Sequence, residues 1–272
     1  MRDAQIPKRI IQTGPAEPPL LLRSAMQTVK LLHPTFEYQF FGDEQVESFI
    51  QDNYPEYRTV YDSFRFRIQR YDFFRYLVVY RLGGFYLDLD VFLVNDLIPL
   101  LMSECVFPFE ELSGIPYLCK QFQMDWQVGN YAFGAQPGDR FLAAIIENCL
   151  RAQSDPSWVA PMMKGIPRPF HKEFYVLNTT GPGLVSRTLA ENPDMAKNVN
   201  VLFPADVREP RTWHQFGDFG VHHMAGSWRG PQNHLSLRLL RLWDAWTLRR
   251  VLSQARNRGK TRSLTLQCTA GE

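Results

Sequence analysis

The stretch GGFYLDLDV, residues 83–91, says most about the fold of this chain. It reads as an apolar β-strand that follows a Gly-Gly break, and alternate residues of a strand share one face. Asp88 and Asp90 are therefore predicted to point the same way. Two neighbouring carboxylates repel one another and are costly to remove from water, and a divalent cation removes that cost. Carboxylate oxygens suit Mg²⁺ or Mn²⁺, which also bind substrate phosphates.

The segments before this stretch predict alternating strands and helices. Ile6–Thr13 and Phe36–Phe41 have the apolar pattern of strands. Each is followed by a helical pattern, over Leu20–Leu32 and Asp43–Asn53. Because the links between these elements are short, two β-α steps in a row favour a parallel sheet.

The rest of the chain continues this pattern. Pro156–Pro169 carries four prolines and is predicted to be a surface loop that acts as a lid. We predict one α/β domain over residues 1–230, with a Rossmann-like, mostly parallel central sheet flanked by helices. A basic C-terminal helix and tail over residues 231–272 would pack on or beside it. Further strands are predicted at 106–109, 117–122, 130–135, 199–203 and 220–224, and further helices at 57–82 with a break near Ser63, 139–151, 179–190 and 235–256.

Composition and charge narrow the class of protein. The net charge is +2, so bulk charge does not favour a nucleic-acid binder. No apolar run is long enough to span a membrane and no signal peptide is visible, so we expect a cytoplasmic protein, with a missing N-terminal anchor as the alternative. Four cysteines form no C-x-x-C pair, which favours buried thiols. Residues Leu235–Arg262 carry eight basic residues and one acid, which predicts peripheral contact with the anionic inner face of a membrane. Packing of the same helix on the α/β domain is the alternative.

Two further features flank the predicted cleft. Asp72 and Arg75 are three residues apart on the helix that ends just before residues 83–91, so they share one helix face and reach the same cleft. A surface ion pair is the alternative. His222 is a candidate third metal ligand, and Trp228 can stack on a base or sugar ring. The histidine could equally be structural, because either ring nitrogen can satisfy a hydrogen bond.

Together these motifs resemble glycosyltransferase family 32, a D-x-D-containing family with fungal α-mannosyltransferases and bacterial capsule and lipopolysaccharide enzymes. They resemble more distantly the large clostridial glucosylating toxins and the α-1,4-galactosyltransferases. The resemblance implies a GT-A fold, a UDP- or GDP-sugar donor, transfer of a hexose with retention of its anomeric configuration, and Mn²⁺ or Mg²⁺. The implied acceptor is a glycan or a lipid-linked sugar. The matching motifs, in the family's order, are residues 6–12, 70–76, 83–90, 130–135, 180–182 and 222–228.

The resemblance also implies roles for individual residues. Asp72, Arg75 and Asp88 would be the catalytic residues at the donor sugar. The metal ligands would be Asp88, Asp90 and His222, with Asp90 the main direct ligand and His222 a better match than His223. The implied nucleotide-sugar contacts are Ile11, Gln12, Asp72, Arg75, Asp88, Asn130, Ser227 and Trp228.

Three positions depart from the family's pattern. Ile11 stands where a histidine is usual, and Gly14 where a tryptophan is usual. Both lie in the loop expected to contact the nucleotide. Tyr71 stands where a small residue is usual.

The identity of a nucleophile stays open. A retaining enzyme can use a carboxylate nucleophile, as glycosidases do, and Asp125 and Glu110 are the candidates. The resemblance favours a front-face reaction instead, in which the leaving phosphate accepts the acceptor's proton.

Two other classes of protein share parts of this pattern. Phosphatases of the haloacid-dehalogenase type also place D-x-D at a strand end. They need Thr or Val where Phe92 stands, and a Gly-Asp-x-x-x-Asp cluster that neither 138–139 nor 217–218 completes. A non-catalytic calcium- or carbohydrate-binding module is the other alternative, although the D-x-D lacks the third acid and the glycine of an EF-hand loop.

Overall fold

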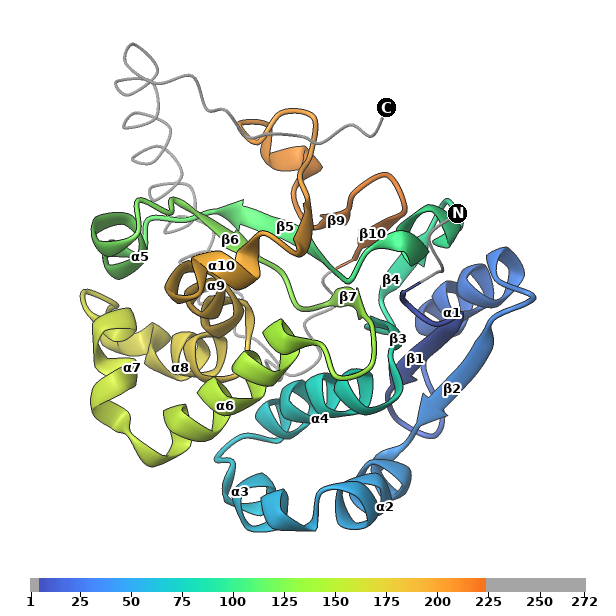
Figure 1. The fold of residues 1–272 in the computed structure, drawn as a ribbon, viewed down its shortest axis with the longest axis horizontal. Helices are drawn as coiled ribbons and strands as arrows, with labels where there is room; N and C mark the ends of the chain where they lie inside the picture. Colours follow the sequence, from blue (N-terminus) through green and yellow to red (C-terminus); the bar gives the residue numbers. More distant parts are fainter. Residues whose placement is uncertain (1–4, 224–272) are drawn as a thin grey trace.

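The computed structural model describes residues 5–223 of the chain. Within that range helices cover both faces of a central sheet, and a smaller sheet lies at one side (Figure 1). The predicted C-terminal helix and tail at 231–272 lie outside the described residues, as do Ser227 and Trp228. The domain boundary at residue 230 therefore stays a prediction.

The central sheet contains seven of the described strands: β1 (Arg9–Thr13), β2 (Glu37–Phe41), β3 (Gly84–Leu87), β5 (Cys105–Leu112), β6 (Trp126–Val128), β7 (Ala132–Ala135) and β8 (Val199–Leu202). Their order is β2-β1-β3-β7-β5-β6, and β8 pairs with β5. β1 is parallel to β2 and β3, and β5 to β8, whereas β7 opposes β3 and β5, and β6 opposes β5. Five strands thus run one way, with β6 and β7 against them, which confirms the α/β class and the mostly parallel sheet.

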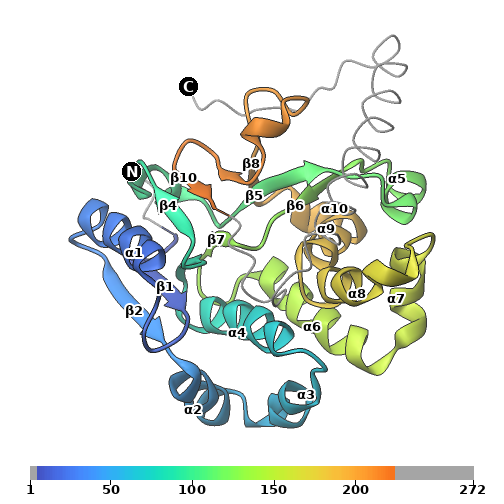
Figure 2. The same cartoon turned by 180° about the vertical axis from the view of Figure 1, so that it is seen from behind.

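Helices pack on the two faces because neighbouring strand residues point to opposite sides. Ile10 and Phe85 share one core with α1 (Leu20–Leu32), which Figure 2 shows from behind. Ile11 and Tyr86 share the other core with α2 (Asp43–Asn53), α4 (Arg67–Leu82), α6 (Arg140–Ser154) and α9 (Pro182–Glu191). The remaining helices are α3 (Arg58–Ser63), α5 (Pro116–Gln121), α7 (Pro156–Met163), α8 (His171–Thr179) and α10 (Pro193–Ala196), with 3₁₀ turns at Pro55–Tyr57, Ile98–Met102, Arg168–Phe170 and Pro210–Thr212.

The Gly-Gly pair before β3 allows a sharp change of direction. Gly83 and Gly84 have φ values of 65° and 108°, which side chains with a Cβ rarely adopt. A Cβ on Gly84 would lie 2.7 Å from the carbonyl oxygen of Arg9. The glycines therefore let the chain leave α4 and lie directly beside β1.

The D-x-D motif lies in a turn, not in the continuous strand that the sequence predicted. β3 ends at Leu87, and residues 88–90 form a turn in which the Val91 N–H donates to the Asp88 carbonyl oxygen at 3.1 Å. The chain then enters β4 (Val91–Leu93), which forms a three-stranded sheet with β10 (Gly220–His222) and β9 (Gln215–Phe216). The turn therefore joins the two sheets, and its geometry, not strand alternation, directs the carboxylates.

Two other predicted segments are wrong. Residues 117–121 belong to α5 rather than a strand, Phe122 directly follows that helix, and Pro116 in its first turn suits a helix start. The proline-rich segment at 156–169 begins as α7, where the Asp155 carboxylate accepts hydrogen bonds from two first-turn N–H groups. This helix, residues 156–163, packs into the core through Trp158, Val159 and Met162, so the first part of the segment is not the surface loop that its prolines suggested.

Within residues 5–223, none of the helices combines the length and the apolar character needed to cross a membrane. Cys105 and Cys149 are buried free thiols, as the spacing predicted, and Cys119 is partly buried. Cys268 lies outside the described residues.

Candidate active site

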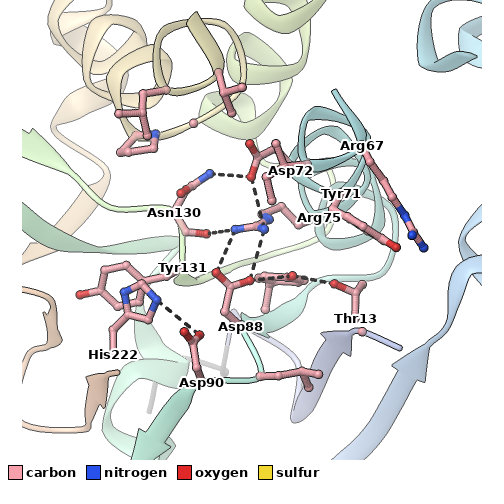
Figure 3. Close-up of a pocket in the computed structure, with 18 of the residues that line it drawn as sticks. Thr13, Arg67, Tyr71, Asp72, Arg75, Asp88, Asp90, Asn130, Tyr131 and His222 are labelled. Carbon is pink, nitrogen blue, oxygen red and sulfur yellow. Dashed lines mark hydrogen bonds and ion pairs between the residues drawn. The ribbon is translucent and has the colours of Figure 1, made fainter. Parts of the chain in front are cut away.

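A cavity of about 630 Å³ lies at the carboxyl ends of β1 and β3 (Figure 3). Its walls come from the loop after β1, from α4, from the D-x-D turn, from residues just before β7, and from β10. In open α/β sheets, ligands bind outside the carboxyl ends of the parallel strands. The cavity is therefore where this fold is expected to bind a substrate.

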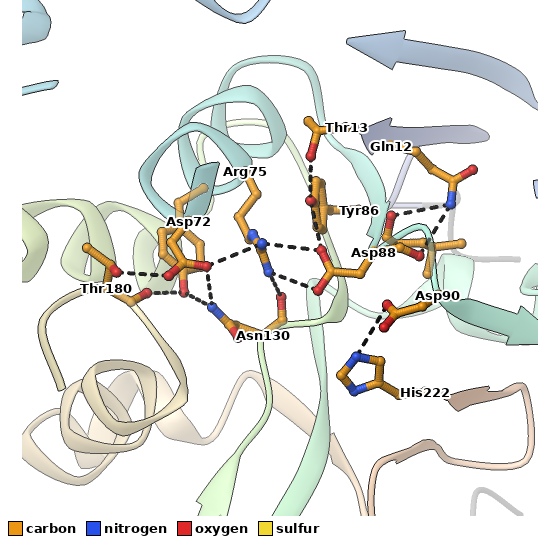
Figure 4. A network of polar contacts seen from close by, with 12 residues as sticks. Gln12, Thr13, Asp72, Arg75, Tyr86, Asp88, Asp90, Asn130, Thr180 and His222 are labelled. Carbon is orange, nitrogen blue, oxygen red and sulfur yellow. Dashed lines mark hydrogen bonds and ion pairs between the residues drawn. The ribbon is translucent and has the colours of Figure 1, made fainter. Parts of the chain in front are cut away.

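Arg75 is the buried positive charge of this cavity, with 4% of the residue exposed. Its Nη2 lies 3.2 Å from Asp72 Oδ1 and 3.2 Å from Asp88 Oδ1. Its Nη1 donates to the carbonyl oxygen of Asn130 at 2.8 Å (Figure 4). Burial alone would lower the pKa of Arg75. The nearby Asp88, Tyr86 and Asp72 outweigh this effect, and the pKa of Arg75 is raised. Arg75 thus stays charged and ties α4 to the D-x-D turn.

Asp72 is buried beside Arg75 and accepts two further hydrogen bonds. Thr180 Oγ1 donates to Oδ2 at 2.8 Å, and Asn130 Nδ2 donates to Oδ1 at 3.2 Å. Burial raises the pKa of Asp72 to about 6, against the opposing effects of Arg75 and the Thr180 hydroxyl. The carboxylate is therefore ionised near neutral pH, at an energetic cost, and it faces the cavity.

Asp88 is fixed from two sides. The Tyr86 hydroxyl donates to Oδ1 at 2.9 Å, and the Asp88 N–H donates to the Tyr131 carbonyl oxygen at 2.7 Å. The Tyr86 hydroxyl also lies 2.8 Å from Thr13 Oγ1. Burial raises the pKa of Asp88, and Arg75 opposes that shift. These contacts orient the carboxylate, which still has 27% of its side chain exposed to the cavity.

Asp88, Asp90 and His222 form a candidate metal site. Each offers one ligand atom, and these atoms lie within 4.8 Å of one another. His222 Nε2 is 3.3 Å from Asp90 Oδ1, and the imidazole stacks on Tyr131 with ring centroids 4.3 Å apart. Mg²⁺ holds ligands at about 2.1 Å, so small side-chain shifts bring all three within reach of one ion. Two carboxylates and an imidazole are a donor set that suits Mn²⁺ or Mg²⁺ with substrate phosphates.

The first predicted nucleotide contacts lie behind the cavity. Ile11 is fully buried in the core between the sheet and α4. Gln12 is also buried, and its Nε2 lies 3.4 Å from the carbonyl oxygens of Leu87 and Asp88. Gln12 thus supports the D-x-D turn from behind, and the residues of this loop that line the cavity are Thr13, Gly14 and Pro15.

The structure gives reasons for two departures from the family's pattern. A Cβ on Gly14 would clash with the side chain of Leu89, the middle residue of the D-x-D motif. A large side chain at position 14 therefore needs a different packing of that residue. Tyr71 lines the cavity and its hydroxyl donates to Asp43, which also pairs with Arg67.

Sequence reasoning included the residues that brace the charged ones in its motifs but did not predict that bracing role. Tyr86 stands two residues before Asp88, so the motif itself held that signal. Thr180 is 108 positions from Asp72, and no local pattern links them. Asn130 was predicted as a donor contact and lines the cavity, but both its N–H groups donate within the protein, to Asp72 and to the Tyr76 hydroxyl.

The two nucleophile candidates differ in position. Glu110 lines the cavity, whereas Asp125 is not among its lining residues. Of these two carboxylates, Glu110 is therefore the one placed to meet a substrate.

Comparison with known proteins places this site in a family. Residues 19–107 match the sequence profile described as the glycosyltransferase sugar-binding region containing a DXD motif. The chain is 44% identical over 234 residues to inositol phosphoceramide mannosyltransferase 2 of Schizosaccharomyces pombe, covering 79% of this chain and 60% of that protein. It is 35% identical over 151 residues to inositol phosphoceramide mannosyltransferase 3 of the same yeast, covering 55% and 39%. The chain thus spans less than two thirds of the length of these relatives.

Solved structures give a more distant likeness. The PaToxG glycosyltransferase has a TM-score of 0.45 at 12% identity, over 71% of this chain and 73% of that one. The ligand-free glycosyltransferase domain of the YGT toxin has a TM-score of 0.43 at 9% identity, over 73% and 80%. These likenesses are distant, and the assignment rests on the sequence comparisons.

The matching profile and the named sequence relatives are those of glycosyltransferases. More specifically, the chain belongs to the DXD-containing glycosyltransferases of the family 32 type. This confirms the resemblance on which the sequence prediction was based, and it decides against a phosphatase of the haloacid-dehalogenase type.

Proposed function

We propose that this chain transfers a hexose from a UDP- or GDP-sugar to a lipid-linked acceptor, with retention and with Mn²⁺ or Mg²⁺ as cofactor. The observation that carries the proposal is the convergence of Asp88, Asp90 and His222 beside Arg75 in one cavity. The relatives named as inositol phosphoceramide mannosyltransferases support mannose as the hexose. They also support an inositol phosphate headgroup on a sphingolipid as the acceptor.

The donor's diphosphate would lie at the D-x-D turn. Asp88, Asp90 and His222 would hold the metal ion, which neutralises charge on the diphosphate as it leaves. Arg75 and the Tyr86 hydroxyl hold the Asp88 carboxylate in place, so it needs no reorganisation when the donor binds. The ionised Asp72 carboxylate would accept hydrogen bonds from hydroxyl groups of the donor sugar.

Transfer would follow the front-face route. The bond from the anomeric carbon to the diphosphate oxygen breaks, and the acceptor oxygen forms a bond to the same face of that carbon. The acceptor's proton passes to the departing phosphate oxygen, so this route requires no carboxylate nucleophile. Arg75 contributes a fixed positive charge next to the region where negative charge develops.

The place of action remains part of this proposal. The cytoplasmic location and the contact of the basic segment 235–262 with an anionic membrane are predictions from the sequence. A lipid-linked acceptor would make such a contact useful, because the headgroup must reach the cavity.

Calorimetry with UDP and with GDP, each with Mn²⁺, tests the proposal and identifies the nucleotide. We expect tight binding of one nucleotide in Mn²⁺ and at least about tenfold weaker binding in EDTA or in Asp90→Asn. Asp52→Asn, at an exposed site on α2 away from the cavity lining, is the matched control and should bind like the parent. Undiminished binding in both EDTA and Asp90→Asn would overturn the metal assignment. NMR of the anomeric proton in the transfer product then reads out retention or inversion.

A further inference from the structure

The cavity has a second polar wall, formed by Glu110 of β5 and by Tyr131 just before β7. The Glu110 side chain is 17% exposed, and Tyr131 is 2% exposed. The proposed donor site uses neither side chain. Both lie on strands or strand ends of the central sheet, where their positions are well fixed.

The backbone of β5 is irregular at Glu110. β5 pairs with β6 at Phe109–Val128 and at Leu112–Trp126, so β5 has one residue more than β6 between these pairs. Such a bulge bends the strand and re-aims a side chain, and bulges are frequent next to active sites. Glu110 lies within this bulge and reaches the cavity.

Gly129 leaves the space that the Glu110 carboxylate occupies. A Cβ on residue 129 would overlap Glu110 Oε2 and would lie 2.7 Å from Tyr131 Cε1. The carboxylate and the Tyr131 ring therefore meet at the same glycine. This places an acidic group and a phenol side by side on one wall.

His214 holds Glu110 from behind. Its Nδ1 lies 3.3 Å from Glu110 Oε1, and its backbone N–H donates to the Glu110 carbonyl oxygen at 3.4 Å. Its own carbonyl oxygen accepts from the His222 N–H at 3.0 Å. His214 also has φ of 57°, which is uncommon for a residue other than glycine and is often found at functional sites. The His214 backbone thus links residue 110 of β5 to the candidate metal ligand His222.

The Tyr131 hydroxyl is buried and has no hydrogen-bond partner among residues 5–223. A buried hydroxyl without a partner is unfavourable, and a hydroxyl of a bound ligand would satisfy it. The Tyr131 ring stacks on His222 at an angle of 16°, and in Figure 3 its hydroxyl points away from Asp88. The Tyr131 ring therefore contacts the candidate metal ligand His222, and its edge lies at Gly129 beside the Glu110 carboxylate.

We propose that Glu110 and Tyr131 form the acceptor subsite and bind neighbouring hydroxyl groups of the polyol ring that receives the sugar, with His214 as a positioning residue. This rests on the proposed function. A carboxylate accepts from two adjacent hydroxyls, and a phenol both donates and accepts, which suits the vicinal hydroxyls of a cyclitol or a sugar. Glu110 binds the ring and takes no proton in the reaction.

Steady-state transfer from GDP-mannose to inositol phosphoceramide in detergent tests the subsite, with Glu110→Gln and Tyr131→Phe as variants. We expect KM for the lipid to rise about tenfold in Glu110→Gln, because this variant loses a charge-assisted hydrogen bond. In Tyr131→Phe we expect a rise of about threefold, because the lost hydrogen bond is neutral. The maximal rate should stay within about threefold and the Kd for GDP with Mn²⁺ within about twofold. Glu111→Gln is the matched control, because Glu111 is the neighbouring acid on β5, contacts Gln127 and is not among the cavity's lining residues.

The role of His214 is tested by measuring KM for the lipid and the maximal rate in two variants of this residue. His214→Asn keeps a donor and tolerates the same backbone conformation, so it should restore most of the lipid affinity that His214→Ala loses. Equal KM values for these two variants would remove His214 from the proposal.

The outcomes separate the subsite from the function on which it rests. A parent protein that shows no transfer overturns the proposed function together with the subsite. A parent that transfers, with variants that match its KM for the lipid, overturns the subsite alone. A loss of maximal rate by about a thousandfold in Glu110→Gln at unchanged KM would make Glu110 a nucleophile or base and would also overturn it.

Discussion

Replacing Asp72 by asparagine should make the fold more stable above neutral pH while impairing donor binding. Asp72 is buried, and burial raises its pKa to about 6 from an ordinary value of 3.8. Asparagine has the same shape and carries no charge. Its oxygen can still accept from Asn130, and its amide can donate to Thr180 Oγ1, which now donates to Asp72.

The size of the effect follows from the pKa. The folded chain holds the Asp72 proton up to about pH 6, whereas the unfolded chain has lost it by about pH 5. The folded state therefore binds more protons in this window, and stability is lost as pH rises through it. A pKa difference of roughly two units lowers the free energy of unfolding by about 3 kcal/mol in total. About 1.4 kcal/mol of this loss falls between pH 5 and pH 8.

Urea unfolding in EDTA at pH 5 and pH 8 measures this contribution. The parent should lose about 1.4 kcal/mol more than Asp72→Asn between the two pH values, so that the variant gains relative stability as pH rises. Groups that do not interact with Asp72, such as Asp139 with its raised pKa, act in both proteins and cancel in the comparison. An identical pH dependence in the two proteins, or a variant that loses more, would refute the account of Asp72 as a strained buried charge.

Three further predictions test other parts of the structure. Arg75→Met should lower kcat/KM at least about tenfold and destabilise the fold by about 3–5 kcal/mol, because it leaves Asp72 and Asp88 without their shared cation; a variant as stable as the parent by thermal melting would contradict this. Gly84→Ala should cost more than about 1 kcal/mol through its φ of 108° and its contact with the Arg9 carbonyl, and unchanged urea unfolding would count against it. Removing residues 231–272 should abolish salt-sensitive binding to anionic vesicles, and binding that persists, or equal binding to neutral vesicles, would rule out the membrane contact.

The sequence predicted those parts of the site whose residues are close in the chain. Asp72 and Arg75 share a helix face, and Asp88 and Asp90 share a short turn, so local spacing was enough to find them. The prediction that Asp88 and Asp90 point the same way was right in outcome and wrong in cause, since a turn and not a strand directs the two side chains. The sequence analysis named Glu110 and the motif at 180–182, but not the contacts of Glu110 with His214 and of Thr180 with Asp72, because tertiary packing sets these partners.

Proline content misled the prediction for residues 156–169. Proline at the first position of a helix and a capping aspartate before it are compatible with α7, and the burial of Trp158 draws that helix into the core. Tertiary burial outweighed the local preference for a loop. A pattern of prolines alone does not distinguish these two cases.

The D-x-D turn is also a mechanical joint. Asp88 is anchored to the central sheet through Tyr86 of β3 and to α4 through Arg75. The Asp90 carbonyl oxygen accepts from the His223 N–H, and the Asp90 carboxylate faces His222 of the small sheet. A metal ion bound by both carboxylates would cross-link the two sheets. The Val91 N–H donates the hydrogen bond that closes the turn, so its hydrogen should exchange more slowly when Mn²⁺ and nucleotide are present. The exchange rate of this one amide would then report whether metal and nucleotide are bound.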